Sequence, residues 1–183
     1  QETLFQKKPD LNNTPLAALV RPACLDDFIG QEHILGKSKP LRKSIENDNI
    51  SSLIFYGPPG VGKTSLAYII SKKTNLAFFE LNAVASTVKD LRESVKKAKE
   101  LFSYYNKKTI VFIDEIHRFN KTQQDALLPY VEDGTIVFIG ATTENPYFAV
   151  NAPLISRSRV YEFKSLNSSH IKQIILKVIE NSK

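Results

Sequence analysis

The chain of 183 residues is 42% hydrophobic and 24% charged, which is the composition of an ordinary globular domain. A chain of this length can bury roughly 70% of its unfolded surface, so it needs no disulfide or metal to hold a core. Its single cysteine excludes an intramolecular disulfide and a cysteine-based zinc site. No apolar stretch approaches the roughly 20 residues that cross a bilayer, and the N-terminus lacks the pattern of a signal sequence, so we expect a cytoplasmic protein with no membrane partner.

The formal net charge of +6 permits a polyanionic partner such as DNA but does not demand one. Much of the excess comes from the lysines of one segment, which are Lys96, Lys97, Lys99, Lys107 and Lys108. We favour a solvated helix face for this cluster over a track for DNA, because a run of like charge on a helix is usually a face turned to water.

Helices and strands are predicted to alternate along the first third of the chain. Residues 1–15 are polar and show no periodicity, so we expect a flexible arm there, followed by a core domain over residues 16–165. A helix is predicted to begin at Pro40, and an apolar run over residues 52–56 predicts a strand. Helical spacing of apolar residues over 63–73 then predicts a second helix.

The alternation continues in the middle of the sequence. Strands are predicted at residues 77–81 and 109–113, and a long amphipathic helix is predicted over residues 88–102 between them. Strands that alternate with helices indicate a parallel sheet covered by helices on both faces. We therefore expect an α/β domain.

The last third of the sequence is predicted to hold two more strands. A polar helix over residues 121–131, bent or ended by Pro129, precedes a strand at residues 135–139. A weaker apolar run predicts a strand at residues 160–163. Residues 168–183 carry apolar side chains at helical spacing and predict a final helix, at which the sequence ends.

A glycine-rich loop joins the strand at residues 52–56 to the helix at residues 63–73. It fits the pattern G-x-x-x-x-G-K-[ST]. The predicted nucleotide contacts of the loop and the next residue are Gly57, Pro58, Pro59, Gly60, Val61, Gly62, Lys63, Thr64 and Ser65. The glycines let backbone N–H groups converge on phosphates, Lys63 reaches the outer phosphates, and the Thr64 hydroxyl holds Mg²⁺. A loop that only connected strand to helix would need neither the lysine nor the hydroxyl, so we predict that the chain binds ATP and magnesium.

Two acidic residues follow the buried strand at residues 109–113. Asp114 and Glu115 come at its carboxyl end, where open α/β sheets bind ligands. Asp114 is predicted to orient the magnesium ion and Glu115 to polarise the attacking water, since phosphoryl transfer depends on positioning and charge stabilisation. The alternative is a solvated pair at a strand end, and the phosphate-binding loop earlier in the chain argues against it.

His117 completes a run, residues 114–117, that imitates the DExH box of helicases with two motor lobes. A chain of 183 residues has no space for a second lobe, so we do not predict a helicase of that kind. We favour a structural or interfacial role for His117, and signalling to the active site is the alternative.

Two further residues are candidates for assisting hydrolysis. The run over residues 135–143 predicts a strand that ends in small hydroxyl residues at the edge of the sheet, where the hydroxyl of Thr143 could hold the attacking water. Arg157 lies in a polar run with Arg159, and arginine suits the γ-phosphate of a neighbouring subunit because its charge is permanent and forked. A turn-forming threonine and surface arginines are the plain alternatives. The presence of the two preceding motifs favours the catalytic interpretation.

In this order the motifs resemble those of the clamp-loader branch of AAA+ ATPases. Within that branch, residues 113–125 (IDEIHRFNKTQQD) and residues 140–146 (GATTENP) are similar to the RarA (MgsA) family of replication-associated recombination proteins, relatives of the Werner-helicase-interacting protein. The runs at residues 15–17 (PLA), 21–22 (RP) and 28–33 (FIGQEH) extend the resemblance over nearly the whole chain.

The resemblance implies a fold and a set of residue roles. The fold would be a P-loop α/β core with a parallel five-stranded sheet in the order 5-1-4-3-2, and residues 166–183 would begin a helical lid, which suggests a fragment. The implied roles are Ile29 and Gly30 at the adenine, Thr143 as sensor 1, Arg157 as a finger acting in trans with Arg159 as runner-up, and Asn82 as a partner that restrains Glu115.

By the same resemblance the protein would be a DNA-dependent ATPase that acts at stalled or gapped replication forks in the bacterial nucleoid. It would assemble as a homo-oligomer through the region missing after this chain and cooperate with single-strand-binding protein. The main alternative is a subunit, like those of clamp loaders or Holliday-junction motors, in which ATP is mainly a structural or assembly ligand. A small-molecule phosphotransferase ranks last, because such enzymes normally lack an adjacent Asp-Glu pair after a buried strand.

The start of the chain carries one short motif of its own. Gln1, Leu4 and Phe5 fit the Q-x-x-L-F pattern by which bacterial proteins dock on the sliding clamp. Leu4 and Phe5 would be the apolar anchors. An inert tail is the alternative, because short motifs occur often by chance.

Overall fold

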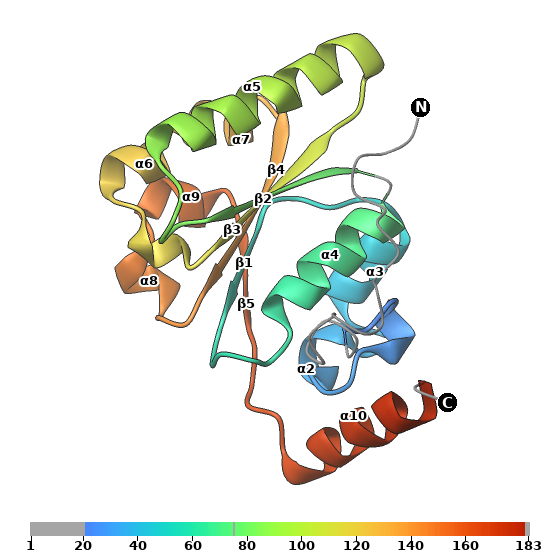
Figure 1. Cartoon of the computed structure of the whole chain (residues 1–183). Coiled ribbons are helices and arrows are strands. Elements are labelled where there is room, and N and C mark those ends of the chain that lie inside the picture. Colours follow the sequence, from blue (N-terminus) through green and yellow to red (C-terminus); the bar gives the residue numbers. More distant parts are fainter. Residues whose placement is uncertain (1–20, 75, 182–183) are drawn as a thin grey trace.

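The computed structural model describes residues 21–74 and 76–181. The arm expected over residues 1–15 lies outside the described residues, together with the clamp-docking pattern at its start. Within the described part, a central sheet separates two groups of helices, which is the layered arrangement that alternating strands and helices predict (Figure 1).

The sheet has five parallel strands, and its order β2-β3-β4-β1-β5 is the predicted order read from the other edge. The strands are β1 (Leu53–Tyr56), β2 (Ala77–Asn82), β3 (Thr109–Asp114), β4 (Ile136–Thr142) and β5 (Arg159–Glu162). The predicted P-loop α/β fold with a five-stranded parallel sheet is therefore confirmed. The loops after β1, β3 and β4 all leave the sheet at its carboxyl edge, where sheets of this kind bind ligands.

Helices cover both faces of the sheet (Figure 1). On one side lie η1 (Leu25–Asp27), α2 (Glu32–Leu35), α3 (Pro40–Glu46) and α4 (Lys63–Lys73). On the other side lie α5 (Val88–Tyr105), η2 (Ile116–Arg118), α6 (Lys121–Asp125), α7 (Leu128–Glu132), α8 (Pro146–Ala149) and α9 (Ala152–Ser156). The last helix, α10 (Ser168–Asn181), lies apart from the sheet. No helix in the described part of the chain is long and apolar enough to cross a membrane.

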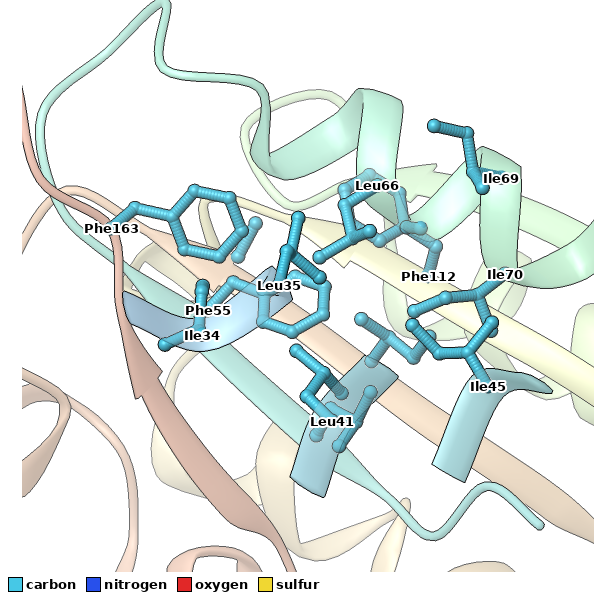
Figure 2. Close-up of a cluster of buried hydrophobic side chains, with 14 of the residues drawn as sticks. Ile34, Leu35, Leu41, Ile45, Phe55, Leu66, Ile69, Ile70, Phe112 and Phe163 are labelled. Atoms are coloured by element: carbon cyan, nitrogen blue, oxygen red, sulfur yellow. The ribbon is translucent and has the colours of Figure 1, made fainter. Parts of the chain in front are cut away.

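The three central strands, β1, β3 and β4, are buried on both faces, to which their successive side chains point in turn. On β3, Phe112 packs with the α2–α4 layer, whereas Val111 and Ile113 pack under the α5 layer. Figure 2 shows the first of these clusters, in which side chains of α2, α3 and α4 surround Phe55 and Phe112. The near-continuous apolar runs of the sequence thus become strands of a parallel sheet with two cores.

The helix predicted over residues 121–131 is in fact two short helices, α6 and α7, and the break falls before Pro129. Pro129 has no N–H, so it cannot donate the helical hydrogen bond to the carbonyl of Asp125, four residues earlier. The first helix accordingly ends at Asp125. Pro129 itself lies in the first turn of α7, where the missing N–H costs nothing.

The fourth strand extends past the apolar run at residues 135–139. It continues through Gly140 and Ala141 to Thr142, and these residues pair with the last three positions of β1. It thus ends in a small hydroxyl residue, as the run over residues 135–143 predicts. The extension brings Thr142 beside Tyr56, at the edge of the sheet where the glycine-rich loop begins.

Side-chain contacts hold the connection between β5 and α10 against the segment around α2. Gln31 is buried, its Nε2 donates to the carbonyl of Lys164 (2.8 Å), and its Oε1 accepts from the Lys164 N–H (2.9 Å). Further along, Lys177 of α10 pairs with Asp27 at 3.0 Å. The final helix is thus anchored to the region of η1 and α2.

Candidate active site

A cavity of about 840 Å³ opens between the loop after β1, the end of β3, the segment around η1 and helix α10. The predicted site residues that line it are Ile29, Pro59, Gly60, Val61, Gly62, Lys63, Thr64, Ser65, Asp114 and Glu115. The glycine-rich loop and the acidic pair are far apart in the sequence. The fold brings them to one space.

Two glycines of the loop occupy positions where no side chain fits. Gly57 has a φ of +144°, and a Cβ there would lie 2.1 Å from the carbonyl oxygen of Phe163. Gly62 has a φ of +100°, and a Cβ there would lie 2.6 Å from the ring of Phe28. Both the backbone conformation and the lack of space require glycine. The loop therefore passes close to the end of β5 on one side and to the segment before α2 on the other.

Lys63 is the first residue of α4, and only 7% of it is exposed. Its Nζ donates to the carbonyl oxygens of Gly57 (2.7 Å) and Pro58 (2.8 Å). Burial lowers the pKa of this amine, and the charges of Glu115 and Asp114 act in the opposite direction. Gly57 and Pro58 thus hold the lysine through their carbonyl groups, behind the residues that line the cavity.

The N-terminus of α4 faces the same cavity, because Lys63, Thr64 and Ser65 of its first turn all line it. Within the described chain no side chain caps this end of the helix. The N–H groups of a first helical turn have no partner within the helix, and the helix dipole is positive there. This end of α4 is consequently suited to bind phosphate.

The acidic pair ends β3 and begins η2. Burial is the main cause that raises the pKa of Asp114, followed by the charge of Glu115, while the N–H of Glu115 and the ammonium of Lys63 oppose the rise. Glu115 has a φ of +54°, in the left-handed region that is uncommon for a residue with a side chain. Such conformations gather at functional sites, where the surrounding structure maintains them.

The oxygen ligands present suit a magnesium ion. Thr64 offers a hydroxyl and Asp114 a carboxylate, and both line the cavity. Mg²⁺ in a phosphate site takes one or two protein oxygens and completes its shell with substrate phosphates and water, so these two groups are enough to hold it.

Two side chains approach the carboxylate of Glu115. Thr143 Oγ1 donates to Glu115 Oε2 at 3.5 Å, and His117 Nδ1 lies 3.2 Å from the same oxygen. The sequence favours a structural or interfacial role for His117. In the structure, however, this side chain lies next to the carboxylate that is predicted to polarise the attacking water. Asn82, the implied restraint on Glu115, instead accepts a hydrogen bond from the N–H of Val84 at 2.9 Å.

Several predicted residues do not line the cavity of their own chain. Arg157 follows α9 and forms an ion pair of 2.6 Å with Glu132, and Arg159 is an exposed residue at the start of β5. Gly30 faces the connection to α10 instead, because a Cβ there would lie 2.8 Å from Leu166 Cδ2. Ile29, the other residue expected at the adenine, does line the cavity.

Sequence reasoning missed one wall of the cavity. The residues concerned are Arg21, Phe28, Leu166, Ile174 and Lys177. Helical spacing in residues 168–183 predicted an apolar stripe that includes Ile174. The sequence does not indicate which part of the fold this stripe packs against, because that depends on the path of the connection after β5.

Comparison with known proteins identifies the family. The model of the ATPase family associated with various cellular activities (AAA) matches residues 53–166. The chain is 51% identical to the replication-associated recombination protein A of Haemophilus influenzae, over 92% of this chain and 38% of that protein. It is 46% identical to the ATPase WRNIP1 of Dictyostelium discoideum, over 97% of this chain and 20% of that protein. The chain thus spans less than half the length of these relatives.

The solved structures agree with this fold. The Thermotoga maritima RuvB Holliday junction branch migration motor superposes with a TM-score of 0.67 at 30% identity, over 86% of this chain and 53% of that one. A point mutant of the same RuvB superposes with a TM-score of 0.70 at 27% identity, over 86% and 53% of the two chains. The chain therefore belongs to the AAA family of ATPases, and its predicted resemblance to the replication-associated recombination protein A (RarA) family is confirmed.

Proposed function

We propose that this chain is the ATP-hydrolysing core of an AAA+ ATPase that remodels replication intermediates at stalled or gapped forks. The observation that carries the proposal is that Lys63, Thr64, Asp114 and Glu115 line one cavity. Phosphoryl transfer to water requires a cation at the phosphates, oxygen ligands for magnesium and a carboxylate that orients the water. These four side chains supply all of them.

Both apolar and polar side chains line the cavity, and the two kinds suit the adenine and the phosphates of ATP. We assign the adenine to the part lined by Ile29 of the segment before α2 and Ile174 of α10. We assign the phosphates to the N-terminus of α4 and to Lys63. Mg²⁺ held by Thr64 and Asp114 would neutralise charge on the phosphates, and Glu115, with Thr143, would orient the attacking water.

The finger residue Arg157 is proposed to act on the nucleotide of a neighbouring subunit. Its position outside the cavity of its own chain supports this assignment. An arginine finger is worth about 10³ to 10⁵ in rate, so the Arg157→Ala protein should be nearly inactive alone. The Lys63→Ala protein should also have a low rate, because it lacks the cation at the phosphates. Mixing them should restore part of the ATPase rate, because an intact finger then meets an intact nucleotide site.

The matched comparison for this experiment is Arg159→Ala mixed with Lys63→Ala. If that pair regains activity while the Arg157→Ala pair does not, Arg159 is the finger. Absence of rescue in both mixtures, with mixed oligomers demonstrated by differential tags, would count against a finger acting in trans.

The proposed substrates and partners rest on relatives named for replication-associated recombination and on a structural neighbour named as a Holliday-junction motor. We propose branched, gapped or single-stranded DNA as the substrate, a homo-oligomer as the working form, and single-strand-binding protein as a partner. Docking on a sliding clamp through Gln1, Leu4 and Phe5 is also proposed. Those three residues lie outside the described part of the chain.

The test is the ATPase rate of the full-length protein with and without DNA. We expect gapped or single-stranded DNA to raise the rate in the presence of Mg²⁺, because a remodelling motor must couple turnover to its substrate. Blunt duplex DNA of equal length is the control. ATP hydrolysis that is equally fast with all three DNAs and with none would contradict the proposed coupling.

A second candidate is a subunit that binds ATP mainly as a structural or assembly ligand. The ion pair between Arg157 and Glu132 favours it, because this contact holds the proposed finger within its own chain. Tight ATP binding without turnover, in the presence of every DNA tested, would support this candidate over the first.

A further inference from the structure

His117 is enclosed between the ends of two strands. Its side chain is only 6% exposed, although it lies close to the cavity edge. Nδ1 lies 2.9 Å from Thr142 Oγ1 and 3.2 Å from Glu115 Oε2, while Nε2 lies 3.5 Å from Glu144 Oε1. Glu115 follows β3, and the other two partners are at and just after the end of β4. The imidazole therefore bridges the carboxyl ends of neighbouring strands.

The chemistry of these partners makes the two ring nitrogens unequal. A neutral imidazole has one N–H, and a carboxylate can only accept a hydrogen bond. With the hydrogen on Nδ1, the ring donates to the Thr142 hydroxyl and places the same positively polarised N–H beside Glu115 Oε2, which lies 3.2 Å from the nitrogen. With the hydrogen on Nε2, the ring donates to Glu144, and Nδ1 accepts from the Thr142 hydroxyl while its lone pair faces Glu115. The first arrangement attracts the carboxylate of Glu115, and the second does not.

Glu115 has few other restraints. Within the described residues, the polar partners of its carboxylate are His117 and the hydroxyl of Thr143, the latter at the long distance of 3.5 Å. Its backbone is in the left-handed region, so the side chain does not leave the strand in the usual direction. The direction of the carboxylate thus depends on a side chain that reaches it from η2.

We propose that His117 is the positioning residue of Glu115. The proposal rests on the role of Glu115 proposed above. Nδ1–H, oriented by its hydrogen bond to Thr142 Oγ1, attracts Oε2 of Glu115 and so ties that carboxylate to the end of β4. Thr142 Oγ1 also accepts from the N–H of Glu144 at 3.0 Å, so the segment is held by the same hydroxyl. A shift of residues 142–144 would move Glu115 through this contact.

The plain alternative is a histidine with a structural role only. His33 is an example in the same chain, because its Nε2 lies 2.8 Å from the backbone carbonyl of Glu162 and no carboxylate of the described residues faces that nitrogen. His117 differs, since both of its nitrogens face carboxylates and one of these belongs to the proposed catalytic residue. The two interpretations predict different kinetics.

The test compares three substitutions in the full-length protein. His117→Phe keeps a ring of similar size and removes both nitrogens, His117→Asn places an amide near the position of Nδ1, and His117→Gln places one near Nε2. We expect Phe to lower kcat roughly 10- to 100-fold with KM and ATP affinity unchanged, as for other loosened catalytic groups. Asn should recover most of kcat, and Gln should not. His33→Asn is the matched control and should behave as wild type.

A double-mutant comparison separates positioning from stability. In a Glu115→Gln background, His117→Phe should cause no further loss of kcat, because the group it positions no longer acts. An equal loss in both backgrounds, a fall in ATP affinity that matches the fall in kcat, or recovery by Gln in place of Asn would overturn the proposal. These outcomes differ from a failure of the proposed function. If Glu115 did not act in hydrolysis, Glu115→Gln alone would hydrolyse ATP at the wild-type rate.

Discussion

Replacing Glu115 with glutamine is expected to lower kcat for ATP hydrolysis by about 10²- to 10⁴-fold, the range over which general bases contribute to catalysis. ATP affinity should not change, because the amide has the same shape and Glu115 is not among the groups assigned to the phosphates or to magnesium. The amide oxygen can still accept from the Thr143 hydroxyl, so the local contacts persist. Steady-state ATPase rates and titration with a fluorescent ATP analogue measure the two quantities.

Glu100→Gln is the matched control for this substitution, since Glu100 is an exposed residue of α5 away from the cavity. It should leave both quantities unchanged. Normal hydrolysis by Glu115→Gln in the full-length protein would show that another group orients the water. A loss of ATP binding would instead assign Glu115 to the ligands of the nucleotide or its metal.

Replacing Lys63 with alanine is expected to weaken ATP binding roughly 10- to 100-fold, because a hydrogen bond to a charged group contributes about 1.5–3 kcal/mol. In the structure the ammonium is buried and held by the carbonyls of Gly57 and Pro58, next to the first turn of α4. A cation held there has little freedom to lose when phosphate binds. Isothermal titration with ATP and Mg²⁺ measures the change in the dissociation constant.

Lys73→Ala is the control for charge and for helix α4, because Lys73 is the last residue of the same helix and is exposed. It should bind ATP as the wild type does. Thermal unfolding of both variants checks that the loop still folds. Wild-type ATP affinity in a folded Lys63→Ala protein would contradict the assignment of this loop to the phosphates.

The elements of the fold were largely predictable, and the exceptions have local causes. The helix α4 begins and ends at the predicted residues, because apolar spacing and the glycine before it are both strong signals. Pro129 does interrupt the helix predicted over residues 121–131, and the break falls before the proline because a proline acts through the carbonyl four residues before it. The strand β4 ends at Thr142, within the run over residues 135–143 that predicts it, although Gly140 and Ala141 pair with β1 without an apolar pattern.

The candidate site was predictable where its parts are contiguous in the sequence. The phosphate loop and the acidic pair could be predicted directly, because the residue types in each motif, taken together, suit one kind of chemistry. The surroundings of Glu115 could not be predicted in this way. The sequence favours a structural or interfacial role for His117, whereas its contact with Thr142 joins two strands that are neighbours only in the folded sheet.

By itself the sequence determined the P-loop, the order of helices and strands, and the family, because these depend on spacing along the chain. The tertiary structure decided three further features, which are the cavity wall from α10, the position of His117 beside Glu115, and the location of Arg157 outside the cavity. Those features arise where segments distant in the sequence pack together. Their contacts depend on strand order and on the path of connections, which no local pattern encodes.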